Sequence, residues 1–315
     1  MTNKKQSFLT IAQNKKILKC EKFLEEMEQV IPWNKLLEEI KPYYPISQFG
    51  RNKTELILLL KIYFLQQWYN LSDPGAEEAI YDRNSFQKFL DIDLISSNIP
   101  DETTILNFRH LLEENKLPER FFEIVDQLLE EKGYIMKEGT IVDASIIKAP
   151  SSTKNQGKKR DPEMSSTKKG NNYYFGMKMH IGVDNQKGLV HTLKTTTAKI
   201  HDRDEFYNLL HGDEKIILGD KGYYNEKDKK HCRSQDIFWG ILDKAKRNQK
   251  LSEKQKRRNK KLSSIRAKVE IPFRVIKCQF NYTKTRYKGL FKNTMQLNTL
   301  FMLTNIYLVR KQLLA

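Results

Sequence analysis

Residues 140–147 read Thr-Ile-Val-Asp-Ala-Ser-Ile-Ile and form the first strand-like run of a sequence whose pattern is helical up to that point. β-Branched residues dominate the run, which predicts a strand buried in a sheet. Asp143 stands in its middle, where burying a carboxylate is costly unless a positive group or a metal ion compensates its charge. An edge-facing or hydrogen-bonded Asp is the ordinary alternative.

Further strands and helices follow this run. Strand-like patterns occupy 174–183, 189–197, 215–218 and 237–242, and apolar residues recur at helical spacing in 203–210, 226–234, 263–280 and 294–313. Three meandering strands followed by alternating helix and strand is the order of a ribonuclease-H-like fold. We therefore expect an α+β or α/β chain whose C-terminal part is a ribonuclease-H-like mixed sheet.

The part before residue 139 differs in pattern and in charge. Its helical segments are 23–31, 54–68, 102–115 and 119–132. Residues 1–140 hold 18 Lys+Arg and 23 Asp+Glu, whereas residues 141–315 hold 38 and 16, within a chain of net charge +17. We therefore expect a helical N-terminal domain, 1–138, and a basic catalytic domain, 139–315.

Two polar segments of the second domain match no element. Residues 149–172 are basic and turn-rich, which predicts a mobile loop between the first two strands. Residues 244–261 hold ten Lys+Arg and one acid, Glu253, and we interpret them as a basic linker, either solvated or ordered by nucleic acid. Their apolar residues are too few for a membrane-surface helix. The charge therefore favours nucleic acid as the partner and no membrane.

The cysteines and the hydropathy bear on location. Cys20, Cys232 and Cys278 are scattered without paired spacing, which indicates reduced thiols. No apolar run reaches the roughly 18 residues of a membrane span, and the first ten residues lack a signal-peptide core. We expect a cytoplasmic protein.

Two more acids stand where the expected fold would bring them to Asp143. Asp220 follows the apolar run 216–218, at the carboxyl end of a strand, and Glu270 lies in a helix that places Arg266 and Lys277 on the same face. A turn aspartate and an ion-pair stripe are the ordinary alternatives. The first strand, the end of the fourth strand and a late helix converge on one edge of a ribonuclease-H-like sheet. Three carboxylates there would suit two Mg²⁺ ions and phosphoryl transfer.

The segments around these acids resemble the DDE transposases of bacterial insertion sequences, specifically the insertion-sequence-five type of the insertion-sequence-four/five superfamily. The resemblance covers almost the whole chain. It is carried by Pro100-Asp101-Glu102-Thr103-Thr104-Ile105, by residues 141–147, by Phe175-Gly176-Met177-Lys178-Met179-His180, by Gly219-Asp220-Lys221-Gly222-Tyr223, and by Arg266, Glu270 and Lys277 in the family's Arg-x3-Glu-x6-Lys signature. The Tyr that precedes this Arg in the family is Ser263 here, and the residue after the Glu, often His, is Ile271.

This resemblance implies roles for individual residues. Asp143, Asp220 and Glu270 would be the catalytic residues and the ligands of two Mg²⁺ ions, for which Mn²⁺ would substitute. Arg266 and Lys277 would contact DNA near the cleaved phosphate. We also expect DNA contacts from three neighbouring cations, Lys268, Arg274 and Arg286.

The function expected on this basis is that of a bacterial, nucleoid-associated transposase. It would bind the terminal inverted repeats of an insertion sequence and target DNA as a homodimer, and would cleave and join strands. The helical domain would serve end binding or assembly. A two-metal DNA endonuclease without strand transfer is one alternative. A domesticated, non-catalytic DNA-binding protein is another, although it predicts loss of the three acids.

Overall fold

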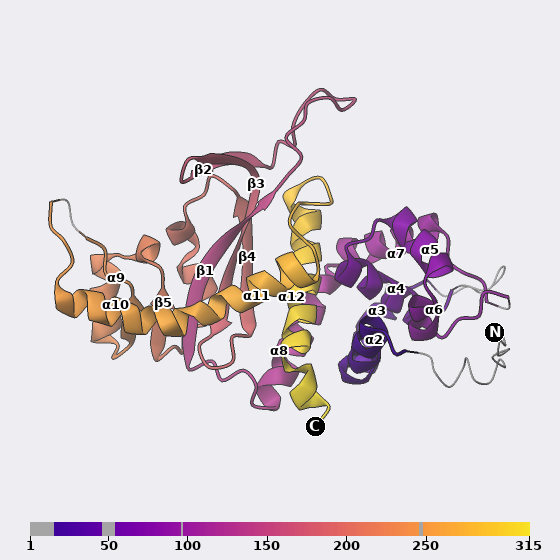
Figure 1. The fold of residues 1–315 in the computed structure, drawn as a ribbon, viewed down its shortest axis with the longest axis horizontal. Coiled ribbons are helices and arrows are strands. Elements are labelled where there is room, and N and C mark those ends of the chain that lie inside the picture. Colours follow the sequence, from indigo (N-terminus) through magenta and orange to yellow (C-terminus); the bar gives the residue numbers. More distant parts are fainter. Residues whose placement is uncertain (1–15, 46–53, 96, 246–247) are drawn as a thin grey trace, which may run out of the picture.

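A computed structural model of the chain describes residues 16–45, 54–95, 97–245 and 248–315 (Figure 1). Its first part is helical, as the sequence predicts. The helices are α2 (Lys19–Val30), α3 (Trp33–Ile40), α4 (Leu56–Tyr69), α5 (Asp73–Asp82), α6 (Asn84–Leu90), α7 (Glu102–Glu114) and α8 (Leu117–Glu131). The four helices with clear apolar periodicity are confirmed to within a few residues. The pattern missed α3, α5 and α6, each of which has ten residues or fewer.

Local chemistry sets the ends of these helices. The Asp101 side chain accepts a hydrogen bond from the backbone N–H of Thr104 at 2.8 Å and so caps the start of α7. Gly133 follows α8 with φ of +71°, a conformation that most residues avoid and that stops the helix. Asp101 therefore lies where apolar periodicity begins, and Gly133 lies where it ends.

The second part is built on a six-stranded mixed sheet. Its strands are β1 (Gly139–Lys148), β2 (Ser165–Lys169), β3 (Asn172–Asp184), β4 (Val190–Thr197), β5 (Ile216–Gly219) and β6 (Phe238–Ile241). The order is β2-β3-β1-β5-β6, with β4 also paired to β3; β1 runs antiparallel to β3 and parallel to β5. This is the ribonuclease-H-like arrangement that the strand order predicts.

The predicted loop 149–172 is wrong at its C-terminal end, where residues 165–169 form strand β2. This strand reads Ser-Ser-Thr-Lys-Lys and is largely exposed, so it has no apolar alternation to detect. It exists because the first half of β3 offers it an antiparallel backbone ladder, from Ser165 opposite Gly176 to Lys169 opposite Asn172.

The helices of the second part are α9 (Glu226–Ser234), α10 (Glu253–Arg266), α11 (Glu270–Arg274) and α12 (Leu290–Leu313). The basic linker predicted at 244–261 is wrong from residue 253 onward, because α10 begins there. Ser252 and Gln255 form a capping box that satisfies the first free N–H groups of α10. The helix predicted at 203–210 is instead two short 3₁₀ turns, Asp202–Glu205 and Tyr207–Leu209.

Alternation along β1 divides the core between the two faces of the sheet. Val142 belongs to a cluster under the 3₁₀ turns and α9, whereas Ile141 belongs to a larger cluster on the opposite face. That larger cluster includes α12, which packs against β4, α8 and α2, and the residues of the N-terminal helices. Buried Asn305 of α12 binds both backbone groups of Val190, at 2.9 and 2.7 Å. The helical part and the sheet therefore share a continuous core, which fixes the position of the sheet relative to the helices.

Within the described ranges, no helix combines the length and the apolar character that crossing a bilayer requires.

Candidate active site

Asp143 and Asp220 are brought together by parallel strand pairing. Val142 of β1 pairs with Gly219 of β5, so the two acids occupy the next position on neighbouring strands, whose spacing is about 4.8 Å. A Cβ on Gly219 would lie 2.9 Å from Val142 Cγ2, so only glycine permits this approach. Asp220 directly follows β5 and caps the next turn by accepting from the N–H of Lys221 at 2.6 Å.

Arg266 compensates the charge of Asp143. Its Nη1 donates to Asp143 Oδ2 at 2.7 Å, and the two side chains are 22% and 18% exposed. The N–H of Ala144 donates to the other carboxylate oxygen at 2.8 Å. Burial nevertheless raises the pKa of Asp143 to about 6, against the lowering effect of these two donors, and the charges of Glu270 and Asp220 raise it further. The three acids are therefore electrostatic neighbours.

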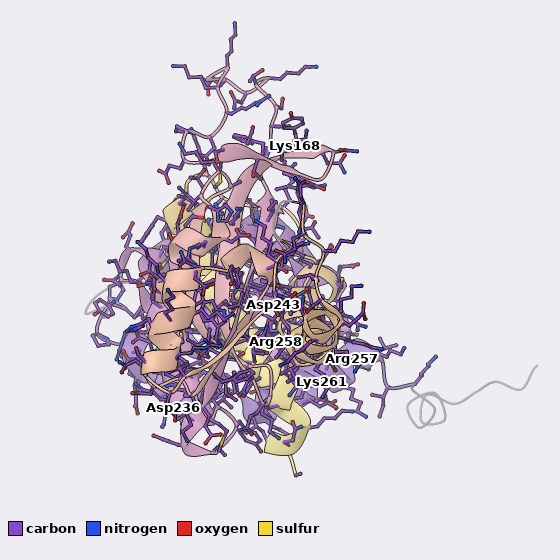
Figure 2. The ribbon with its side chains drawn as sticks, turned by 90° about the vertical axis from the view of Figure 1, so that its left-hand side faces the viewer. Lys168, Asp236, Asp243, Arg257, Arg258 and Lys261 are labelled. Carbon is purple, nitrogen blue, oxygen red and sulfur yellow. The ribbon has the colours of Figure 1, made fainter. Side chains whose placement is uncertain are left out.

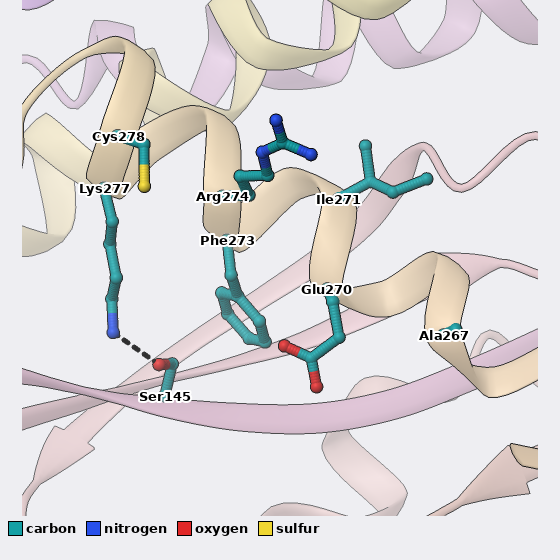
Figure 3. Close-up of a pocket in the computed structure, with 8 residues that line it drawn as sticks. All are labelled: Ser145, Ala267, Glu270, Ile271, Phe273, Arg274, Lys277 and Cys278. Atoms are coloured by element: carbon teal, nitrogen blue, oxygen red, sulfur yellow. Dashed lines mark hydrogen bonds between the residues drawn. The ribbon is translucent and has the colours of Figure 1, made fainter.

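Glu270 reaches this region from the segment that follows α10. The sequence predicts one continuous helix over 263–280, but the backbone tightens into a 3₁₀ turn at Ala267–Val269 and widens into a π-turn at Val275–Gln279. The predicted common side of Arg266, Glu270 and Lys277 is nevertheless kept, because all three face β1. Figure 3 shows Glu270 and Lys277 pointing from this segment toward the strand that carries Ser145.

Lys277 is held against β1. Its Nζ donates to Ser145 Oγ at 2.6 Å and to the carbonyl of Ile146 at 3.1 Å. Burial and then the charge of Lys169 lower the pKa of Lys277, and Lys148 adds to this effect. A cluster of cations therefore lies beside the three carboxylates, where a phosphate would relieve their mutual repulsion.

A cavity of about 450 Å³ opens between the segment 267–278 and β1. Among its lining residues are Glu270, Lys277, Ser145 and Arg274 (Figure 3). It thus exposes one of the three acids together with two cations, a combination that suits a ligand carrying both a metal ion and phosphate groups.

The donor set fits a hard divalent cation in its chemistry. All three acids offer oxygen, the ligand that Mg²⁺ prefers, and the raised pKa of Asp143 shows that this carboxylate lacks full compensation. Among the described residues, however, no three His, Cys, Asp or Glu side chains already form a metal-holding group. Arg266 already supplies a positive charge beside Asp143. A metal ion bound there would have to share the Asp143 carboxylate with Arg266 or displace Arg266 from it.

The other predicted DNA contacts are arranged differently. Arg274 is exposed and lines the cavity. Lys268 instead donates to the carbonyls of Asn185 and Gln186, at 2.9 and 3.0 Å, and holds the turn between β3 and β4. Arg286 donates to Asn70 and so joins the C-terminal part to the helical part. Lys268 and Arg286 are therefore engaged within the chain itself.

Sequence reasoning missed three residues of this site. Ser145 orients Lys277, and its position two residues after Asp143 on a strand was the available signal, because alternate residues share a face. Lys148 and Lys169 had no such signal. They end β1 and β2, and these two strands come close only because both pair with β3. Lys148 Nζ also lies 5.5 Å from the ring centre of Tyr174.

The chain is similar to known proteins in sequence and in structure. Residues 135–306, more than half of the chain, match the family described as "Transposase DDE domain", and residues 12–111 match the one described as "Transposase domain (DUF772)". The cryo-EM structure of a piggyBac transposase synaptic complex with hairpin DNA is similar over 93% of this chain and 74% of that chain, at 10% identity and a TM-score of 0.43. The family match over the sheet and its acids shows that this chain belongs to the DDE transposases.

Proposed function

We propose that the protein cleaves and joins DNA at the ends of an insertion sequence, of the insertion-sequence-five type, with Asp143, Asp220 and Glu270 as catalytic residues. One observation carries the proposal. Asp143 is a largely buried carboxylate whose pKa is raised to about 6 and whose like-charged neighbours are the other two acids. Strongly perturbed carboxylates that gather beside a cavity are typical of catalytic sites.

Each residue has a separate task in this proposal. The three acids would hold two Mg²⁺ ions, or Mn²⁺ in their place, which when bound activate the attacking oxygen and stabilise the leaving oxygen. Arg266 and Lys277 would bind the phosphate that is cut, and Ser145 would keep Lys277 directed at it. Arg274, exposed on the same cavity, would neutralise a neighbouring phosphate.

The remaining expectations complete the proposal. The helical part, 1–138, would bind the terminal repeats or assemble a homodimer that holds two ends and the target. The C-terminal part, 139–315, would be the catalytic domain. The protein would act in the bacterial cytoplasm, on the nucleoid, and its C-terminal excess of positive charge supports a polyanionic substrate.

The test is a Mg²⁺-dependent nicking assay on duplex DNA that carries the element ends. We expect Asp143→Ala and Asp220→Ala to abolish nicking, whereas Asp213→Ala, which removes an exposed acid outside the site, leaves it intact. Precut ends then measure strand transfer separately. Nicking that survives in Asp143→Ala would contradict the catalytic assignment, and nicking without transfer would identify an endonuclease.

A further inference from the structure

Helix α10 presents two faces of different kinds. Its inward face is fixed to the edge of the sheet, because Arg258 donates to the carbonyls of Trp239 and Ile241 and to Asp243, at 2.5, 3.1 and 3.1 Å. Asn259 exchanges two further hydrogen bonds with the backbone of Asp243, at 2.9 and 3.1 Å. The helix therefore cannot turn on its axis without breaking these bonds.

The outward face is basic and exposed. At about 100° per residue, positions 254, 257 and 261 fall within about 60° of one another, and Leu262, which is buried, lies well away from their centre. Lys254, Arg257 and Lys261 are all exposed. Figure 2 labels Arg257 and Lys261 near Arg258, whose hydrogen bonds direct it to the edge of the sheet.

None of these outward cations forms a direct ion pair within the described residues. The described part of the chain gives ion pairs to Lys256, Arg258 and Arg266 in this helix, but none to Lys254, Arg257 or Lys261. Like charges three and four residues apart each destabilise a helix by roughly 0.2–0.5 kcal/mol. A bound polyanion would remove this repulsion.

The side chains on the outward face of α10 indicate which kind of partner it can bind. Ile265 is the one large apolar side chain that α10 exposes, so the helix offers no apolar patch to a protein or a bilayer. The C-terminal end of α10 is Arg266, which contacts Asp143, so the basic row leads away from the proposed site of cleavage. From Lys254 to Lys261 it extends about 10 Å, a length of duplex axis that carries about six phosphate charges.

We infer that the row Lys254, Arg257 and Lys261 binds the phosphate backbone of duplex DNA that extends beyond the cleaved site. The inference rests on the proposed function for the nature of the polyanion. The contacts we infer are to phosphate oxygens, which are the same at every base pair, so they are independent of sequence. They extend the DNA-binding surface from the cavity along the whole of α10.

The test measures affinity for a duplex of arbitrary sequence as a function of salt, with full-length protein. Each lost phosphate contact lowers the slope of log K against log salt by about 0.9, so the triple variant Lys254→Gln/Arg257→Gln/Lys261→Gln should lose up to about 2.7 in slope. If variant and wild type bind equally at 1 M salt, this difference in slope corresponds to a loss of up to about 500-fold in affinity at 0.1 M salt. The matched control Lys194→Gln/Lys215→Gln/Lys311→Gln changes the net charge equally, at exposed sites to which the proposal gives no DNA contact, and should alter the slope little.

Each outcome decides something. An equal slope in the triple variant and the wild type would overturn the inference about α10 and leave the proposed function standing, whereas a wild type with no affinity for duplex DNA would overturn both. Tighter binding of duplex RNA would assign the row to a different partner. If the triple variant fails to fold, acetylation of wild-type lysines gives a second readout, in which DNA should protect Lys254 and Lys261 but not Lys215.

Discussion

Replacing Asp143 with Asn should stabilise the metal-free protein at neutral and alkaline pH. The pKa of Asp143 rises from 3.8 to about 6 on folding, chiefly through burial. A raised pKa means that the folded state prefers the protonated form, so the ionised carboxylate opposes folding above pH 6 and has no effect below pH 3.8. At about 1.4 kcal/mol per pH unit, the shift corresponds to at most about 3 kcal/mol.

Asn keeps the shape of Asp but carries no charge, and only its Oδ1 can accept, so it keeps the hydrogen bond from Arg266 or the one from Ala144, not both. Part of the gain is lost because the Arg266 cation then has no adjacent counter-ion. The net effect should be a rise of a few degrees in the thermal midpoint at pH 8. The rise should shrink as the pH falls from 6 to 4.

The measurement is thermal unfolding of Asp143→Asn and wild type in buffer with a chelator, at pH 4, 6 and 8. Asp213→Asn, at an exposed acid, is the matched control and should differ from wild type by the same small amount at every pH. Replacing the chelator with Mg²⁺ should then raise the midpoint of the wild type and not that of Asp143→Asn. A variant that is less stable at pH 8, or a difference that stays constant across the pH range, would refute the reasoning.

Three further substitutions test the frame around the site. Arg109→Ala should lower the free energy of unfolding by about 3–5 kcal/mol, measured by urea denaturation, because Glu113 then keeps a buried charge without its partner at 2.8 Å. Gly219→Ala should cost about 1–3 kcal/mol by overpacking against Val142, and its nicking rate should fall as the strand ends separate; unchanged nicking would show that the close approach is dispensable. Lys268→Ala should destabilise the protein by about 1 kcal/mol through the lost turn contacts, while wild-type stability would mean that these bonds contribute nothing.

The sequence predicted the strands well because each has a local signature. The runs 140–147, 174–183 and 189–197 are rich in β-branched or alternating apolar residues, and the structure places strands there within two residues of the predicted ends. Strand β2 and helix α10 have no such signature. Their residues are polar and basic, and each element is held by hydrogen bonds to a neighbouring strand: β2 pairs with the backbone of β3, and Arg258 of α10 donates to the backbone of β6.

The sequence also singled out three acids: Asp143 lies inside an apolar run, Asp220 directly follows one, and Glu270 shares a helix face with two cations. Their catalytic role remains a prediction, which the nicking assay addresses. The sequence could not show which of the nearby basic residues are hydrogen-bonded within the chain itself. Lys268 and Arg286 look like the other basic residues of the region, yet the fold commits them to carbonyl and amide groups that lie far away along the chain.

The sequence by itself indicated the longer helices of the first part and most strands of the sheet, and it singled out three acids, because hydrophobic periodicity and a carboxylate beside apolar residues are properties of short segments. Only the tertiary structure decided which charges meet. Parallel pairing of β1 with β5 sets Asp143 beside Asp220, and the packing of the segment 266–277 against the sheet brings Arg266 and Lys277 onto β1. These contacts join residues more than 70 positions apart, and the energy of such charges depends on burial and distance, which exist only once the chain has folded.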